Sequence, residues 1–233
     1  MGSTANIYRG QDPVDVPAYS PAIAAHHLRL PTSTVRYWAL GRGHDYAPII
    51  VIADRDEQLL SFRNLIELHV LSAIRRKHRV SLQAARKAVR YLRGELESQH
   101  PLSDGEMMTD GKNLFVERYG QLINASQEGQ MAMRDLLDAH LQRIDRDDRG
   151  APVRLFPFTR PQLDSPRAVV IDPRVQFGRP CISGTGVPTL IIFERFQAGE
   201  ALTLLAEDYG RDVGDLEEAV RYESAAAIRS AAG

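Results

Sequence analysis

The chain has 233 residues, 43% of them hydrophobic, and a single cysteine, which predicts a buried core and excludes an intramolecular disulfide or a multi-cysteine metal site. No apolar run approaches the roughly 18 residues of a membrane span, and the N-terminal stretch lacks the apolar segment of a secretory signal, so we expect a cytoplasmic protein with no membrane partner. The formal net charge is −1, yet residues 1–100 carry five more basic than acidic residues and residues 101–233 carry six more acidic than basic ones. This asymmetry favours an N-terminal half that binds an anion, and chance variation is the alternative.

The stretch from residue 19 to residue 41, YSPAIAAHHLRLPTSTVRYWALG, predicts two short helices joined by a turn. Ser20 can cap the first helix and Gly41 can end the second, for which Thr32 or Ser33 is the candidate cap. Val35 and Trp38 lie on one face of the second helix and should be buried. Four other side chains of the helix are then expected to be exposed, and they are of types that contact phosphates and base edges in DNA complexes: Thr32, Ser33, Arg36 and Tyr37.

This stretch resembles the opening of MerR-like DNA-binding domains, in which a helix-turn-helix is followed by a wing of strands. The resemblance implies a DNA-binding domain over residues 1–100. It would bind operator DNA through the four exposed side chains, with Arg42 near a phosphate. Residues 48–62, PIIVIADRDEQLLSF, would form the wing, although their acidic tip weakens them as a DNA contact. A helical hairpin that touches no DNA is the alternative.

Two longer helices are expected next, at residues 61–77 and 81–97, capped by Ser61 and Ser81. The first is apolar on much of its surface and should be a central core helix. The second has one apolar seam, which either packs on its own domain or forms a dimer seam, as the resemblance to MerR-like proteins implies. Eight basic residues cluster around this helix pair: Arg75, Arg76, Lys77, Arg79, Arg86, Lys87, Arg90 and Arg93. They either produce a positive electrostatic field that attracts an anion or only form a solvated helix face.

Residues 101–160 predict a small α+β segment that packs on the N-terminal domain or on a second subunit. Asp110-Gly111 lies between apolar runs and is a hairpin signal, which predicts short strands at Leu114–Val116 and Gln121–Ile123. Ser126 can cap a helix that reaches Ile144, and a strand is expected after the charged turn that follows. No residue pattern here points to chemistry.

Residues 159–167, TRPQLDSPR, predict a linker and a boundary before a C-terminal module at residues 168–233. The module should contain a strand at residues 169–171, a loop rich in glycine and proline, and three short helices in a helix-turn-helix-like arrangement. Glycines permit positive φ and prolines stiffen the path. The loop is therefore expected to shape a strand-to-helix crossing that a partner protein recognises, and not to cradle a phosphate.

Enzymatic motifs are missing from the sequence. Gly184 and Gly186 give G-x-G without the third glycine of a dinucleotide fingerprint, and no Walker loop exists. The histidines have no metal-binding spacing, and Cys181 has no histidine near it in the sequence. We therefore expect no enzyme, no catalytic residue, no metal and no cofactor.

An ordered series of short motifs in the C-terminal module carries the strongest resemblance. Ile171-Asp172-Pro173, Gly178-Arg179-Pro180, Ile182-Ser183-Gly184-Thr185 and Ala219-Val220-Arg221-Tyr222 resemble a small bacterial domain of unknown function. That family is similar to antitoxins encoded beside PIN-like ribonuclease toxins, although it usually has arginine where this chain has Gly186. Joined to a MerR-like half, the module looks like the longer VapB-type antitoxins.

The resemblance implies an antitoxin of a type II toxin–antitoxin pair that binds a PIN-like ribonuclease toxin and, as a homodimer, its own operator DNA. The candidate toxin-binding residues are Arg174, Arg179, Ile182, Gly184, Thr185 and Arg195. The main alternative is a MerR-like regulator with a small-molecule sensor domain and no toxin. A scaffold in which both helix-turn-helix units bind protein is another. The expected fold is mainly α with small β hairpins: a winged helix-turn-helix, a small α+β middle layer and a three-helix C-terminal domain.

Overall fold

The structure is a computed structural model that describes residues 8, 10–42, 46–75 and 82–230. The described residues form nine α-helices and two short antiparallel hairpins, which confirms the predicted mainly α class with small hairpins. The helices are α1 (Pro21–Leu28), α2 (Thr32–Leu40), α3 (Phe62–Arg75), α4 (Leu82–Glu95), α5 (Asp110–Ile123), α6 (Gln127–Leu141), α7 (Thr189–Gln197), α8 (Leu202–Tyr209) and α9 (Val213–Ser230). The hairpins pair β1 (Ile144–Arg146) with β2 (Pro152–Leu155), and β3 (Val169–Val170) with β4 (Cys181–Ile182).

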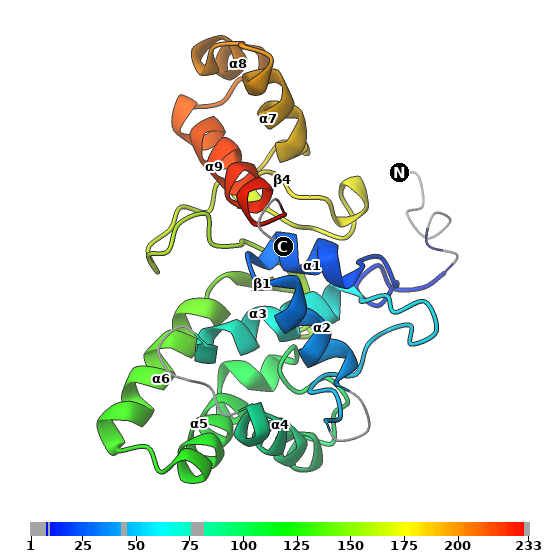
Figure 1. Cartoon of the computed structure of the whole chain (residues 1–233), viewed down its shortest axis with the longest axis vertical. Helices are drawn as coiled ribbons and strands as arrows, with labels where there is room; N and C mark the ends of the chain where they lie inside the picture. The colour runs from blue at the N-terminus through cyan, green and yellow to red at the C-terminus, as the bar shows by residue number, and fades with distance from the viewer. Residues whose placement is uncertain (1–7, 9, 43–45, 76–81, 231–233) are drawn as a thin grey trace.

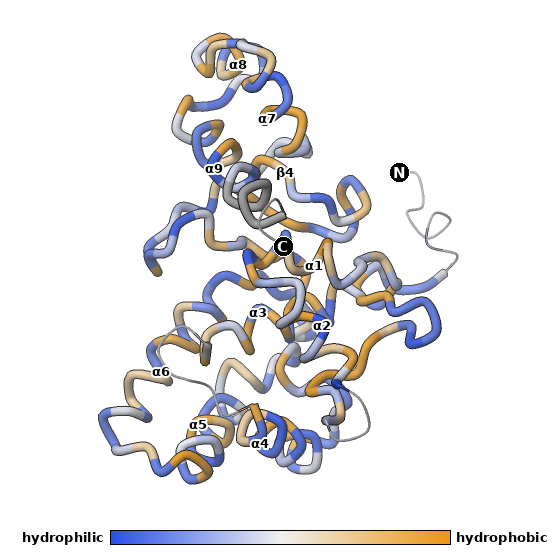
Figure 2. The backbone as a smooth tube through the Cα atoms, in the orientation of Figure 1, coloured by the Kyte–Doolittle hydropathy of each residue, from blue (hydrophilic) through white to orange (hydrophobic). Residues whose placement is uncertain are grey.

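The helices lie in three groups along the long axis of the molecule (Figure 1). Helices α4, α5 and α6 occupy one end, and α7, α8 and α9 occupy the other. Helices α1 and α2 lie between them beside α3, which packs on both α1 and α6. Hydrophobic and hydrophilic segments alternate along α4, α5 and α6 (Figure 2), as expected for helices with one buried face. Within the described residues, none of the helices has the length and apolar character that crossing a membrane requires.

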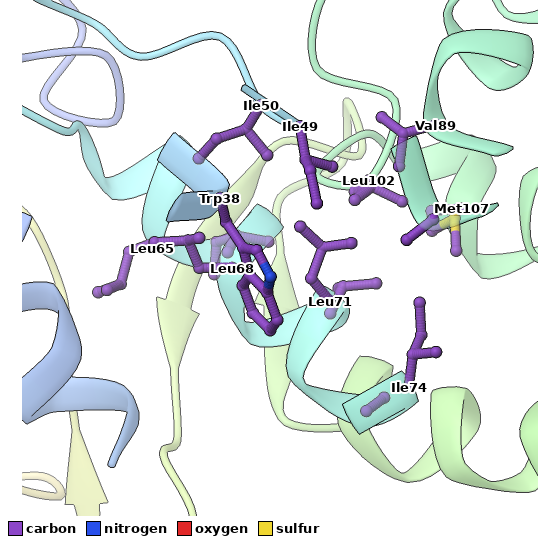
Figure 3. Packing of buried hydrophobic residues seen from close by; sticks show 14 of the residues in the cluster. Trp38, Ile49, Ile50, Leu65, Leu68, Leu71, Ile74, Val89, Leu102 and Met107 are labelled. Carbon is purple, nitrogen blue, oxygen red and sulfur yellow. The ribbon is translucent and has the colours of Figure 1, made fainter. Parts of the chain in front are cut away.

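Helix α3 is the centre of the larger hydrophobic core, as its apolar surface predicted. Leu65, Leu68 and Leu71 are almost completely buried, and Trp38 of α2 packs beside them (Figure 3). Burying a side chain of this size stabilises the fold by about 1.5–3 kcal/mol. The predicted cap is also present, because the Asn64 N–H donates to Ser61 Oγ at 3.3 Å.

The predicted hairpin around Asp110-Gly111 is wrong, because residues 110–123 form helix α5. The apolar run has helical spacing: Phe115 and Tyr119 lie four residues apart, are buried, and stack with ring centroids 5.9 Å apart. Gly111 is needed for close approach, since a Cβ there would lie 3.0 Å from the Glu106 carbonyl oxygen. Gly111 is therefore a packing glycine of a helix and not a turn glycine.

The predicted wing does not form a strand pair in residues 48–62, where the structure contains isolated bridges instead. Ile49 and Ile50 are buried against the core, and the Ile49 N–H donates to the Trp38 carbonyl at 2.8 Å. The β-branched run is therefore a core-filling segment. The predicted cap of α2 is also wrong: Pro31 occupies the N-cap position and makes no side-chain bond. Ser81 lies outside the described residues.

From Ser126 onwards, the structure agrees with the prediction in part. Ser126 caps α6, its hydroxyl accepting from the Gly129 N–H at 3.1 Å, but the helix ends at Leu141 and Ile144 starts β1. The three C-terminal helices are present and enclose a small second core around Ile182, Ile192 and Leu216. The predicted linker is packed: Arg143 donates to the carbonyls of Ser165 and Pro166, and buried Thr159 donates to Glu218 of α9.

Candidate functional site

The exposed face of α2 is the candidate DNA-binding surface. Ser20 caps α1 as predicted, accepting from the Ile23 N–H at 3.3 Å, and Gly41 ends α2 with φ of 81°. Val35 and Trp38 are buried, so the opposite face of α2 is left to solvent. Three of its predicted contact residues are exposed, namely Thr32, Ser33 and Arg36.

Tyr37 is half-buried and belongs to an aromatic cluster at the end of α2. Its ring lies 6.0 Å from that of Tyr46, and the Arg86 guanidinium of α4 lies 5.6 Å from the Tyr37 centroid and 5.9 Å from the Tyr46 centroid. Arg86 also donates to the Ala47 carbonyl at 2.6 Å. Arg42 is exposed and forms a bridge with Tyr46. The cluster places two aromatic rings and two arginines beside the exposed face of α2.

Helix α4 has an internal apolar seam and a charged outer face. Ala85, Val89 and Leu92 are buried, and α4 packs on α5 within the same chain. The seam therefore packs within the chain, on a helix of the predicted middle segment that lies outside residues 1–100. Lys87 and Arg90 are exposed. The side chain of Arg75 and all of Arg76, Lys77 and Arg79 lie outside the part of the chain that the structure describes.

The loop of residues 172–180 is the first candidate partner-binding element. Asp172 starts it: its carboxylate accepts from the Arg174 N–H at 2.9 Å and pairs with Arg154 at 3.2 Å. Three consecutive residues then have positive φ, Gln176 at 49°, Phe177 at 54° and Gly178 at 75°. Because Gly178 approaches the ring of Tyr19, a Cβ there would lie 1.9 Å from the Tyr19 hydroxyl oxygen.

The candidate toxin-binding residues do not form one patch. Arg174 and Arg179 are exposed on this loop, and Gly184 and Thr185 are exposed on the turn between β4 and α7. The two loops are adjacent, since a Cβ on Gly186 would lie 3.5 Å from Val175 Cγ1. The remaining two candidates lie elsewhere: Ile182 is fully buried in the second core, and Arg195 pairs with Glu200 and Asp208.

A polar network between α1 and the C-terminal helices was missed by sequence reasoning. His26 Nε2 lies 3.0 Å from Glu223 Oε2, and the other carboxylate oxygen of Glu223 accepts from Thr189 at the start of α7. The Tyr222 hydroxyl donates to the His27 carbonyl at 3.1 Å. No local signal pairs residues 197 positions apart. Glu223 lies seven residues after Leu216 and four after Ala219, a helical spacing that places it on the buried face of α9.

Titration shifts in this region follow burial. Burial, and then the charge of His26, lowers the pKa of His27 to about 3, so His27 is neutral at pH 7. Burial raises the pKa of the Cys181 thiol to about 11, with the nearby Asp172 carboxylate adding to the effect. The thiolate that a nucleophilic cysteine needs is therefore disfavoured at pH 7. Among the described residues, no cluster of histidine, cysteine, aspartate and glutamate is arranged to hold a metal ion.

Comparisons with known proteins agree with the C-terminal resemblance in part. Residues 169–222 match the family model described as "Protein of unknown function (DUF433)". The chain is 29% identical over 232 residues to a Mycobacterium tuberculosis protein named "Putative antitoxin VapB45", covering 88% of this chain and 93% of that protein. It is 23% identical over 210 residues to uncharacterized protein Rv2308 of the same organism, covering 84% and 85%.

The fold is also similar to a solved structure. The crystal structure of Rv2018 from Mycobacterium tuberculosis superimposes with a TM-score of 0.70 at 26% identity, covering 88% of this chain and 98% of that one. Together, the DUF433 match and the similarity to VapB45 support an antitoxin-like protein.

Proposed function

We propose that this chain is an antitoxin of a type II toxin–antitoxin system, which neutralises a PIN-like ribonuclease toxin by direct binding. The observation that carries the proposal is the similarity to VapB45 over nearly the whole of both chains, together with the DUF433 match over the C-terminal helices. In this proposal, the exposed loops around Arg174, Arg179, Gly184 and Thr185 contact the toxin. Ile182 supports them from the core, and Arg195 braces α7 against α8.

The N-terminal half binds operator DNA as a homodimer and represses its own gene, in the same proposal. Exposed Arg36 on α2 would reach a base edge, while Thr32, Ser33 and Arg42 would contact phosphates. The Tyr37–Arg86 cluster would then hold the end of α2 and add positive charge beside it. The exposed Lys87 and Arg90 of α4 extend the basic surface.

Co-expression with the protein encoded by the neighbouring gene tests the toxin half of the proposal. A stable complex and restored growth are the expected results. Filter binding to the chain's own promoter tests the DNA half, and the affinity should fall steeply as salt rises. Absence of both complex and toxicity would remove the antitoxin proposal.

A second candidate function is a MerR-like regulator with a small-molecule effector and no toxin. One observation favours it: an open cleft of about 630 Å³ is lined by Arg29, Thr159, Arg160, Asp164 and Arg221. Arg29 lies in the turn between α1 and α2, and Arg221 lies on α9. A ligand in this cleft would touch both the candidate DNA-binding helices and the C-terminal module. Operator binding that depends on an added metabolite, without a toxin, would support this function.

A further inference from the structure

The tip of the loop at residues 172–180 presents an aromatic side chain to solvent. Phe177 is 66% exposed, the highest value among the large hydrophobic residues that the structure describes. Its φ of 54° lies in the left-handed region, which residues with a Cβ rarely adopt. Both features are unfavourable for an isolated protein, since neither the backbone geometry nor the exposed ring stabilises the fold. Positive φ at a residue that is not glycine costs free energy, and at Phe177 it coincides with an exposed aromatic ring.

The loop is nevertheless held by bonds to distant parts of the chain. The Tyr19 hydroxyl donates to the Gly178 carbonyl at 3.3 Å, and the Tyr8 hydroxyl donates to the Pro173 carbonyl at 2.5 Å. Within the loop, the Gly178 N–H donates to the Val175 carbonyl at 3.0 Å. The Tyr8 ring contacts the Phe177 ring edge-on at 6.4 Å. Phe177 is therefore displayed by an ordered scaffold, which lowers the entropic cost of binding.

The surroundings of Phe177 are apolar at the centre and basic at the rim. Val175 is 38% exposed, and a groove of about 340 Å³ runs from Phe177 along Pro173 to Tyr8 and Pro17. Arg174 and Arg179, which flank Phe177 in the sequence, are both exposed. Neither guanidinium has a carboxylate partner among the described residues, in contrast to the paired Arg154, Arg160 and Arg195.

The charge of the loop is opposite to that of its module. Residues 168–233 contain ten acidic and six basic residues, whereas the loop at residues 172–180 contains two arginines and one acid, Asp172, which pairs with Arg154 outside the loop. A partner surface that complements this loop has an apolar pocket with an acidic rim. Phenylalanine and arginine are both enriched at protein interfaces, and arginine is among the residues that most often carry binding energy there. A metal-binding ribonuclease site has carboxylates, so it supplies the acidic rim.

We propose that Phe177 is the anchor of the toxin interface, inserted into an apolar pocket while Arg174 and Arg179 pair with acidic groups around it. This inference rests on the proposed antitoxin function and specifies the surface that performs it. Phe177 carries the affinity, and the two arginines accelerate association through electrostatic attraction.

The test measures binding of the full chain to the purified ribonuclease encoded beside it, by calorimetry and by surface-based kinetics. Phe177→Ala should weaken the complex by about 30-fold, the effect of a hot-spot residue. Phe196→Ala is the matched control, because Phe196 is also exposed, at 41%, but lies at the far end of α7. Its affinity should stay within about twofold of the wild type, as for a surface substitution outside the contact.

Two further variants separate the contact from the fold. Phe177→Asn introduces a residue that tolerates the left-handed conformation, so the thermal unfolding midpoint should stay that of the wild type. The affinity for the ribonuclease should fall as much as it does in Phe177→Ala. The double variant Arg174→Glu, Arg179→Glu should slow association and remove most of its salt dependence.

The outcomes distinguish this inference from the function on which it rests. A wild-type chain that does not bind the ribonuclease overturns both. A wild-type chain that binds, with Phe177→Ala binding equally well, overturns the anchor and leaves the antitoxin function standing. A Phe177→Ala chain that binds the toxin normally but no longer self-associates would assign the surface to a second copy of the chain, and would also overturn the inference.

Discussion

The imidazole of His26 in α1 lies 3.0 Å from the carboxylate of Glu223 in α9, joining the first helix of the chain to the last. The same carboxylate accepts from Thr189, the first residue of α7, and is only 5% exposed. One buried acid therefore connects the candidate DNA-binding helices to two helices of the candidate toxin-binding module. The Glu223 side chain therefore contributes to the packing of both ends of the protein.

Glu223→Ala should destabilise the protein because it removes the carboxylate acceptor of the buried Thr189 hydroxyl, which keeps only the Pro180 carbonyl at 3.3 Å, and because it removes the partner of His26. The expected loss is about 1–3 kcal/mol in the free energy of unfolding, measured in urea at pH 7. Glu217→Ala is the control, since Glu217 is exposed on the same helix, and it should change stability by less than about 0.5 kcal/mol. Equal losses in both variants would argue against the network.

Acid should destabilise the fold through His27. Its pKa is lowered by burial from 6.5 to about 3, so the unfolded chain binds a proton below pH 6.5 while the folded chain does not. The free energy of unfolding is therefore unaffected by His27 above pH 6.5 and decreases as the pH falls from 6.5 toward 3. The loss reaches about 2 kcal/mol at pH 5.

Replacing His27 by glutamine should reduce this pH dependence, as measured by urea unfolding between pH 7 and pH 5. The variant is expected to start from a lower stability at pH 7, because the ring contact with Tyr19 at 5.7 Å is lost. An unchanged slope in His27→Gln would show that other groups cause the acid sensitivity.

Gly178→Ala should displace the loop at residues 172–180. Its Cβ would lie 1.9 Å from the Tyr19 hydroxyl oxygen, and its φ of 75° disfavours alanine. The backbone effect alone costs about 1–2 kcal/mol, and loss of the Tyr19 hydrogen bond adds about 1 kcal/mol. Gly210→Ala is a matched control, because its φ is 59° and no atom lies within 4 Å of the new Cβ. Thermal unfolding should show the larger loss for Gly178→Ala, and a reversed order would contradict the close contact with Tyr19.

Arg36→Ala should weaken operator binding without changing stability, because Arg36 is exposed on α2. A loss of about 1–3 kcal/mol that varies with operator sequence would identify a base contact. A uniform loss across sequences would identify a phosphate contact. Arg149→Ala, on the exposed turn between β1 and β2, is the control for a general loss of positive charge. Unaltered filter binding by Arg36→Ala would refute the assignment of α2 as the recognition helix.

The sequence predicted most helices because their apolar spacing and caps are local signals. Ser20, Ser61 and Ser126 cap helices as expected, and Val35 and Trp38 are buried. The errors arose where a residue type serves two purposes. Gly111 allows close helix packing where a turn was predicted.

The candidate sites were less accessible to sequence reasoning. Ile182 shares a motif with exposed Gly184 and Thr185, yet it is buried. Phe177 combines an exposed ring with positive φ at a residue that is not glycine, and no local sequence pattern predicts either feature. The pairing of His26 with Glu223 depends on tertiary packing between segments 197 residues apart.

The most direct measurement is a titration of the purified chain into the protein encoded by the neighbouring gene, the proposed ribonuclease toxin, following both heat of binding and RNA cleavage. If the chain is an antitoxin, a stable complex should form and cleavage should fall to the background level at stoichiometric ratio. An active ribonuclease that neither binds the chain nor loses activity in its presence would contradict the proposed function.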